Sequence, residues 1–338
     1  MIEARLSSVH GDIYELFARK GEFLDLASNI NPFKPKDLDS KLLEFVERAF
    51  YYPENRYESL RSAIASSMNW DLNEIVFGNG SIELIEFFFR VVRGKIVIAQ
   101  PTFTEYERFA KIYGSRVIDV KYNINEILDA IGRIKPDGLV ICNPNNPTGD
   151  FIRKEDFEEI VEAAERFGTK VLTDQAFIDF VKPYDVDAFQ VRSLTKILGI
   201  PGLRFGYGRF PKEFAKKFEE MRIPWNVNNL AKAVAENYLP KLRAFSRFVR
   251  RKMAREKEHL RRRLKKLGIE AQGKANFLLC YGIDSEKLFE FMLSRRILIR
   301  RCEDFKYLDD KYFRIAVKDR KSNRIFLKNL EEFRDTFR

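Results

Sequence analysis

The feature that most constrains this fold is the alternation of short apolar segments with amphipathic helical segments between residues 55 and 173. Apolar runs predict strands at residues 75–77, 95–99, 116–120, 138–142 and 170–173. Apolar residues spaced three and four apart predict helices at 58–68, 81–92, 106–113 and 154–167, with an earlier helix at 39–50. This order predicts an α/β fold with a mostly parallel central sheet and helices on both faces. Ligands of such sheets bind at the carboxyl ends of the strands.

The pattern changes after about Pro224. A long helical region at 230–266 precedes a strand at 277–281, a helix at 285–295, strands at 298–301 and 312–317, and a last helix at 323–337. This order predicts a smaller α+β domain. We therefore divide the chain of 338 residues into a large domain, 41–238, and a small discontinuous domain, 1–40 with 239–338.

The net charge of +11 comes from one segment. Thirteen lysines and arginines but only two acidic residues, Glu256 and Glu258, lie between Lys241 and Lys266, and the rest of the chain is balanced. Apolar residues recur there at helical spacing, so we interpret the segment as an amphipathic helix with a solvated basic side. A nucleic-acid surface is the alternative that this charge leaves open.

The cysteine content predicts a reducing environment. The three cysteines, Cys142, Cys280 and Cys302, form no CxxC pair, and the N-terminus lacks the pattern of a secretory signal. These features predict a cytoplasmic protein without disulfides, and we expect no metal site. The most apolar stretch, residues 84–92, is interrupted by two charged residues and is too short to span a membrane.

Three polar segments stand at predicted strand ends. Residues 77–83, FGNGSIE, form a glycine turn that opens a helix, where free N–H groups and the helix dipole favour an anion. Residues 143–149, NPNNPTG, cannot continue a strand and leave asparagine side chains above the sheet. Asp174 directly follows a buried strand, where a carboxylate needs a cationic partner. Taken singly, the first segment is also typical of a connecting turn, and Asp174 of a helix N-cap.

A fourth segment, residues 192–207, contains Lys196 between hydroxyl residues and a glycine-rich apolar run. A lysine in such surroundings is desolvated. It is therefore suited to act as an amine nucleophile.

Together and in this order, the four segments resemble the fold type I pyridoxal-phosphate (PLP) enzymes of the class I and II aminotransferase superfamily. The resemblance implies a PLP-dependent enzyme in which Lys196 binds the cofactor covalently, Asp174 pairs with its pyridinium nitrogen and Asn146 binds its ring hydroxyl. The implied phosphate ligands are Ser193, Arg204 and the backbone of Gly80, Ser81 and Ile82.

Aromatic side chains complete the implied cofactor site. One of them stacks on the cofactor ring, and we favour Tyr106 over Phe103 for this role. Gln175 and Phe177 stand where the family usually has Glu and often has Tyr, so one hydrogen bond to the ring hydroxyl is expected to be absent. Tyr57 matches the tyrosine that reaches the cofactor phosphate of the neighbouring subunit, which implies a homodimer.

Segments near both ends of the chain indicate which subfamily of the superfamily it resembles. Segments at residues 10–15, 26–32, 52–57, 223–228, 296–302 and 312–317 are similar to the threonine-phosphate decarboxylases of cobalamin synthesis. Histidinol-phosphate aminotransferases share the NPNNPTG and lysine segments but less of both ends. The implied substrate ligands are His10, Asn29, Asn146, Arg300 and Arg314, of which Arg314 grips a carboxylate or an equivalent anion.

The resemblance therefore predicts decarboxylation of L-threonine O-3-phosphate to (R)-1-amino-2-propanol O-2-phosphate. Because the motifs fix the cofactor and not the orientation of the substrate, an aminotransferase acting on histidinol phosphate or another amino acid is the alternative. A non-catalytic nucleic-acid-binding protein of the same fold would rest on the basic helix alone. We expect neither nucleic acid nor a membrane as a partner.

Overall fold

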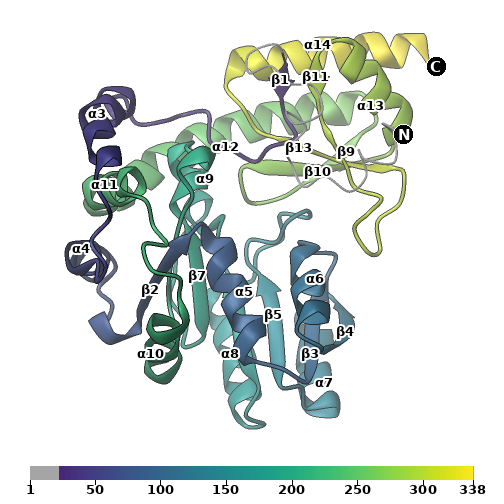
Figure 1. The fold of residues 1–338 in the computed structure, drawn as a ribbon. Coiled ribbons are helices and arrows are strands. Elements are labelled where there is room, and N and C mark those ends of the chain that lie inside the picture. Colours follow the sequence, from purple (N-terminus) through teal and green to yellow (C-terminus); the bar gives the residue numbers. More distant parts are fainter. Residues whose placement is uncertain (1–22, 338) are drawn as a thin grey trace.

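A computed structural model describes residues 23–337, and its largest element is a seven-stranded sheet (Figure 1). In spatial order the strands are β2 (Ile75–Asn79), β8 (Phe205–Arg209), β7 (Phe189–Ser193), β6 (Lys170–Asp174), β5 (Gly138–Cys142), β3 (Lys95–Gln100) and β4 (Arg116–Lys121). β8 runs antiparallel to both of its neighbours, and the other adjacent pairs are parallel. The predicted mostly parallel sheet is confirmed.

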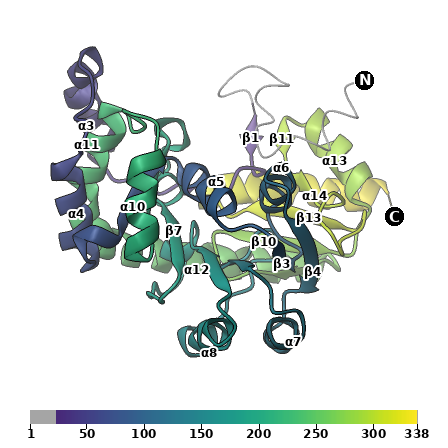
Figure 2. The ribbon, with the colours of Figure 1, turned by 60° about the horizontal axis from the view of Figure 1, so that its bottom comes forward.

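Helices cover both faces of this sheet (Figure 2). On one face lie α5 (Ser81–Val91), α6 (Glu105–Ile112) and α10 (Lys212–Met221), and on the other lie α7 (Ile124–Ile134) and α8 (Lys154–Glu165). In β3, Ile96 and Ile98 pack into the first layer, whereas Val97 and Ala99 pack into the second. Successive side chains of a strand point to opposite faces, so a strand buried on both sides is expected to be mostly apolar.

A smaller lobe combines the beginning and the end of the described chain. Strand β1 (Leu24–Asp25) pairs in parallel with β11 (Ile297–Leu298). A four-stranded sheet follows the order β12 (Arg300–Arg301), β13 (Tyr312–Ala316), β10 (Phe277–Tyr281) and β9 (Glu270–Gln272), with α13 (Ser285–Ser294) and α14 (Arg320–Thr336) beside it. After β1 the chain reaches the large domain, where the backbone N–H of Asn31 donates to the carbonyl of Lys196 at 3.2 Å.

The remaining helices lie beside the large sheet and between the lobes (Figure 1). They are α3 (Leu38–Phe45), α4 (Glu58–Met68), α9 (Leu194–Leu198), α11 (Asn229–Tyr238), α12 (Leu242–Lys266) and the short 3₁₀ helices η1 (Val46–Phe50), η2 (Leu72–Glu74), η3 (Ile178–Phe180), η4 (Pro201–Leu203) and η5 (Leu239–Lys241). The helix predicted over 230–266 is thus divided at η5, where Pro240 lacks a backbone donor. Within residues 23–337, no helix combines the length and the apolar character that crossing a membrane requires.

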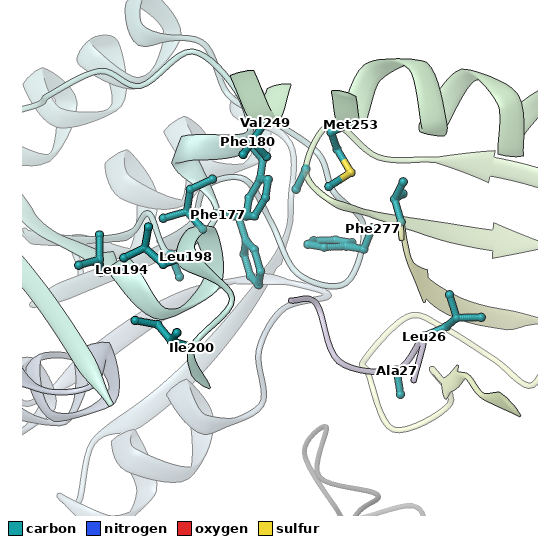
Figure 3. Close-up of a cluster of buried hydrophobic side chains, with 14 of the residues drawn as sticks. Leu26, Ala27, Phe177, Phe180, Leu194, Leu198, Ile200, Val249, Met253 and Phe277 are labelled. Atoms are coloured by element: carbon teal, nitrogen blue, oxygen red, sulfur yellow. The ribbon is translucent and has the colours of Figure 1, made fainter. Parts of the chain in front are cut away.

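Apolar packing joins the two lobes (Figure 3). Phe177, just after β6, meets Phe277 of β10 edge-on, with the ring centroids 5.0 Å apart. Val249 and Met253 of α12 belong to the same buried cluster. A shared core therefore holds the smaller lobe against the carboxyl end of the large sheet.

Candidate active site

A cavity of about 820 Å³ lies where the carboxyl ends of the central strands meet the smaller lobe. Its wall contains Asn29, Gly80, Ser81, Ile82, Phe103, Asn146, Asp174, Phe177, Ser193, Lys196, Arg204, Arg300 and Arg314. Of the other predicted site residues, Tyr57 and Tyr106 do not line this wall, and His10 lies outside the described residues. Motifs that are far apart in the sequence therefore meet in one cavity.

Lys196 lies on α9, the short helix that directly follows β7. Its Nζ lies 5.9 Å from the centroid of the Phe177 ring. Burial, together with the positive charges of Arg314 and Arg204, lowers the pKa of Lys196 from an ordinary 10.5 to about 8. The neutral amine, which is the form that attacks a carbonyl, is therefore accessible near neutral pH.

Asp174 ends β6 and is only 4% exposed. Its Oδ1 accepts a hydrogen bond from the backbone N–H of Ala176 at 2.9 Å, and its Oδ2 accepts one from the hydroxyl of Tyr106 at 2.6 Å. Burial raises the pKa of Asp174, and these two hydrogen bonds and the charge of Lys196 oppose the rise. The result is a buried, oriented carboxylate that suits a cationic partner such as a protonated ring nitrogen.

The structure reverses the preference between the two aromatic residues near the start of α6. Phe103 lines the cavity, whereas Tyr106 is fully buried and donates its hydroxyl hydrogen to Asp174. The two rings meet edge-on, with centroids 5.5 Å apart. Phe103 is therefore the side chain placed to stack on a ring in the cavity, and Tyr106 acts on such a ring only through Asp174.

Glycine backbone and a guanidinium group form an anion cradle at the start of α5. Gly80 has a φ of 81°, and a Cβ at this residue would lie 2.5 Å from Nη2 of Arg204. A Cβ at Gly206 would lie 2.2 Å from the backbone N of Ser81. The absence of side chains at both glycines lets Arg204 and the first turn of α5 come together. N–H groups at a helix N-terminus attract anions, so this corner is suited to a phosphate.

Two arginines of the smaller lobe face the cavity from adjacent strands. Arg300 of β12 and Arg314 of β13 are direct partners in the antiparallel register. Arg314 donates from Nη1 to Oδ1 of Asn146 and from Nη2 to the carbonyl of Ala27 at 2.8 Å, and Arg300 forms an ion pair with Asp304. Burial lowers the pKa of Arg314 to about 10, so it is cationic at neutral pH. Its buried Nε has no hydrogen-bond partner among the described residues, which is unusual for a buried polar group.

Tyr57 lies in the core of its own chain. Its hydroxyl donates to the carbonyl of Val227 at 2.7 Å and accepts from the N–H of Val227 at 3.1 Å. Its ring meets Phe77 edge-on, with centroids 5.3 Å apart. To reach the cofactor of a neighbouring subunit, the side chain would have to leave this packing, so the geometry does not support the role predicted for Tyr57.

Several wall residues were not identified from the sequence. Asp25 and Glu105 add carboxyl groups, and Phe305 adds an aromatic side chain from the segment between β12 and β13. Thr195 also lines the cavity, and its Oγ1 lies 2.8 Å from Oγ of Ser193. The two hydroxyl residues that precede the lysine are a usable sequence signal for Thr195, whereas the place of Phe305 follows only from the packing of the smaller lobe.

The groups around the cavity fit PLP. An anion cradle, a buried carboxylate and a primary amine surround one volume, as a phosphate, a ring nitrogen and a carbonyl require. Gln175 is held elsewhere, because its Oε1 accepts a hydrogen bond from Nε of Arg192 at 3.1 Å. Asn29 and Asn146 are the amide side chains on the cavity wall, and Asn146 is the one that the resemblance assigns to the ring hydroxyl.

Known proteins resemble this chain over nearly its whole length. The model of the family described as aminotransferase class I and II matches residues 21–330. A protein of Caldanaerobacter subterraneus subsp. tengcongensis, provisionally assigned as a threonine-phosphate decarboxylase, is 35% identical over 327 residues, which cover 90% of this chain and 88% of the relative.

Two solved structures share the fold and a substantial part of the sequence. The histidinol-phosphate aminotransferase of Clostridium acetobutylicum matches with a TM-score of 0.83 and 32% identity, covering 92% of this chain and 99% of the other. The L-threonine-O-3-phosphate decarboxylase of Porphyromonas gingivalis matches with a TM-score of 0.83 and 28% identity, with the same coverage of 92% and 99%.

Proposed function

The chain belongs to the class I and II aminotransferase family of PLP-dependent enzymes, and from that premise we propose that it decarboxylates L-threonine O-3-phosphate. The products would be (R)-1-amino-2-propanol O-2-phosphate and CO₂. The relative provisionally assigned to this activity, at 35% identity, supports the choice.

The observation that carries the proposal is the pairing of Arg300 with Arg314 on adjacent strands at the cavity. Phosphothreonine presents two anionic groups, a carboxylate and a phosphate, close to its amine. Histidinol phosphate presents one anionic group and an imidazole, but the 2-oxoglutarate that its transamination also needs presents two carboxylates. Two neighbouring guanidinium groups match two anions, and each charge-assisted hydrogen bond contributes about 1.5–3 kcal/mol. The arginine pair therefore supports a substrate with two anions, and the relative at 35% identity supports phosphothreonine as that substrate.

Different residues of the protein would bind the cofactor, move the proton and orient the substrate. When bound, PLP supplies an electron sink for the bond that breaks at the substrate α-carbon. Asp174 holds a proton on the ring nitrogen, and Lys196 is placed to move a proton at the α-carbon. Arg300 and Arg314 orient the two anions of the substrate, and that orientation decides whether the carboxylate or the hydrogen leaves the α-carbon.

The proposal includes a homodimer. Phe50, Tyr51 and Tyr52 are 84%, 74% and 81% exposed, and the Tyr52 ring lies 5.2 Å from that of Trp225. Exposed apolar patches of this kind mark interaction surfaces. The occupant that we assign to this patch is a second copy of the chain.

The domain limits and the cellular location are also part of the proposal. The strands of the large sheet fall between residues 75 and 209, which supports a large PLP-binding domain at 41–238 and a small one at 1–40 with 239–338. The three cysteines are free and buried, which supports a cytoplasmic location.

Two assays test the reaction. Purified protein with PLP is incubated with phosphothreonine alone, and separately with histidinol phosphate and 2-oxoglutarate. We expect CO₂ release in the first incubation and no glutamate in the second, and Lys196→Ala is expected to abolish the CO₂ release. Glutamate formed only in the second incubation would show that the enzyme is an aminotransferase.

A further inference from the structure

The basic helix α12 turns two of its cations toward the protein interior. Nζ of Lys257 donates to the carbonyls of Lys274 and Ala275, the latter at 2.8 Å. Arg261, one turn further along, donates from Nη2 to the carbonyl of Gly273. Three consecutive carbonyls of the loop between β9 and β10 are thus held by α12. Burial lowers the pKa of Lys257 to about 8, as expected for an amine with only carbonyl partners around it.

The other side of the 273–275 loop contacts the large domain. The backbone N–H of Lys274 donates to the carbonyl of Gly149 at 2.7 Å. A Cβ added at Gly149 would lie 2.5 Å from Cα of Gly273, so the two backbones are in direct contact. No side chain separates the two loops at this point, and a shift of one backbone has to move the other.

Gly149 belongs to the loop that carries Asn146. The N–H of Gly149 donates to the carbonyl of Asn145 at 2.7 Å, and Nδ2 of Asn145 donates to Oγ1 of Thr148 at 2.9 Å. Asn146 itself faces the cavity and accepts a hydrogen bond from Arg314. The contact with the small lobe is therefore three residues from the amide that the cavity offers to the cofactor.

The N-terminal half of α12 is bonded to the segment of the large domain that follows β6. Oγ of Ser246 donates to Oδ1 of Asp179 at 3.0 Å, and Nη1 of Arg250 donates to the carbonyls of Asp179 and Val181 at 3.2 and 3.0 Å. Asp179 follows Asp174 by five residues. One rigid helix thus connects the segment after β6 with the loop that contacts Gly149.

We propose that Lys257 and Arg261 are positioning residues, which hold the 273–275 loop against Gly149 and thereby fix Asn146 in the cofactor site. Neither side chain lines the cavity. The inference rests on the PLP site of the family and not on the choice between decarboxylation and transamination. Failure of the reaction proposed above therefore leaves it intact.

The test measures PLP affinity of the cofactor-free protein by equilibrium dialysis, without any turnover. Lys257→Met and Arg261→Met are each expected to raise the Kd for PLP about tenfold, which corresponds to about 1.4 kcal/mol. Lys257→Arg, which keeps a cation on the helix, is expected to recover most of the affinity. The matched control is Arg251→Met, an exposed cation of the same helix, whose Kd is expected to stay within about twofold of the wild type.

A double-mutant cycle separates positioning from general destabilisation. If Lys257 acts through the loop, Lys257→Met in an Asn146→Ala background is expected to weaken PLP binding by less than about twofold further. Hydrogen exchange at the amides of Gly149 and Lys274 is expected to speed up in Lys257→Met and not in Arg251→Met. Multiplicative effects of the two substitutions on the Kd, or equal behaviour of Lys257→Met and Arg251→Met, would overturn the proposal.

Discussion

At the scale of single residues, the surroundings of Lys196 set the pH range of the site. Its amine is buried among arginines, which places its pKa at about 8. Only the neutral amine attacks a carbonyl, so the rate at which cofactor-free protein captures PLP covalently is expected to rise about tenfold per pH unit below pH 8 and to level off above it.

Stopped-flow absorbance after mixing with PLP measures this rate across the pH range. A lysine with the ordinary pKa of 10.5 would keep gaining rate up to that pH, and such a profile would contradict the prediction. Lys196→Arg is the control, because its guanidinium has no neutral form in this range and gives no covalent capture.

The same pKa shift has a defined effect on stability. The folded-state pKa of Lys196 lies below its unfolded value, so between about pH 8 and 10.5 the unfolded chain binds more protons than the folded one. The contribution of this lysine to the unfolding free energy therefore rises with pH across that window, and below pH 8 its buried charge disfavours folding. The protein tolerates this cost at the position where the chemistry needs a readily deprotonated amine.

Sequence alone could place the reactive residues but not the ones that support them. Asp174 stands at the end of a strand that the sequence predicted, and the ends of parallel strands share one edge of the sheet. Lys196 was recognised from the segment around it, because β7, the strand before it, was not predicted. The choice between Phe103 and Tyr106 depends on which side of the start of α6 faces the cavity, and that is decided by packing. Tyr57 has a φ of 52° at the N-cap of α4, which a sequence pattern does not reveal.

At the scale of elements, the outer side of α12 carries the net charge of the molecule. Arg247, Arg251 and Arg255 are exposed and four residues apart, so each is one helical turn from a like charge. Like-charge pairs at this spacing destabilise a helix. Arg251→Glu replaces two repulsions by two attractions and is expected to raise the unfolding free energy by about 0.8–2 kcal/mol.

Urea unfolding measures this change, and Arg251→Gln, which only removes the repulsions, is expected to give about half of it. Neither variant should change the turnover rate, because Arg251 does not line the cavity. A loss of stability in Arg251→Glu would mean that the outer side of α12 is stabilised by a partner or packing that needs the positive charge.

Two strands, β7 and β8, were not predicted from the sequence, and the structure shows why. β8 contains Gly206 and Gly208, whose Cβ positions are blocked by backbone atoms of neighbouring segments, so the strand looks like a turn. β7 contains the buried polar residues Gln190 and Arg192, which interrupt its apolar run and bond to Asp185. Predicted strands such as β3 and β5 carry apolar residues on both faces.

At the scale of the whole molecule, the cavity lies between two lobes that are held together by several separate contacts. Nζ of Lys306, from the smaller lobe, lies 2.6 Å from carboxylate oxygens of both Glu107 and Asp119 in the large domain. The edge-on contact of Phe177 with Phe277 closes another side of the junction. Neither connection carries a sequence motif, because each depends on how two separately folded sheets meet.

The exposed aromatic patch beside α3 gives the last prediction, which concerns the assembly. The wild-type protein is expected to sediment as a dimer, and the double substitution Tyr51→Asp with Tyr52→Asp is expected to give monomers. Burying an aromatic side chain contributes about 1.5–3 kcal/mol, and in a two-fold interface each residue is buried twice. Charges introduced there lose this burial and also have to be desolvated.

Sedimentation velocity at several protein concentrations measures the change. Ile112→Asp is the matched control, because Ile112 is a 58% exposed apolar residue on α6, away from α3 in both views (Figures 1 and 2). It is expected to leave the dimer intact, since single exposed apolar residues outside a patch are ordinary surface. A monomeric wild type, or a dimer that survives both aspartates, would exclude this face as the interface between copies.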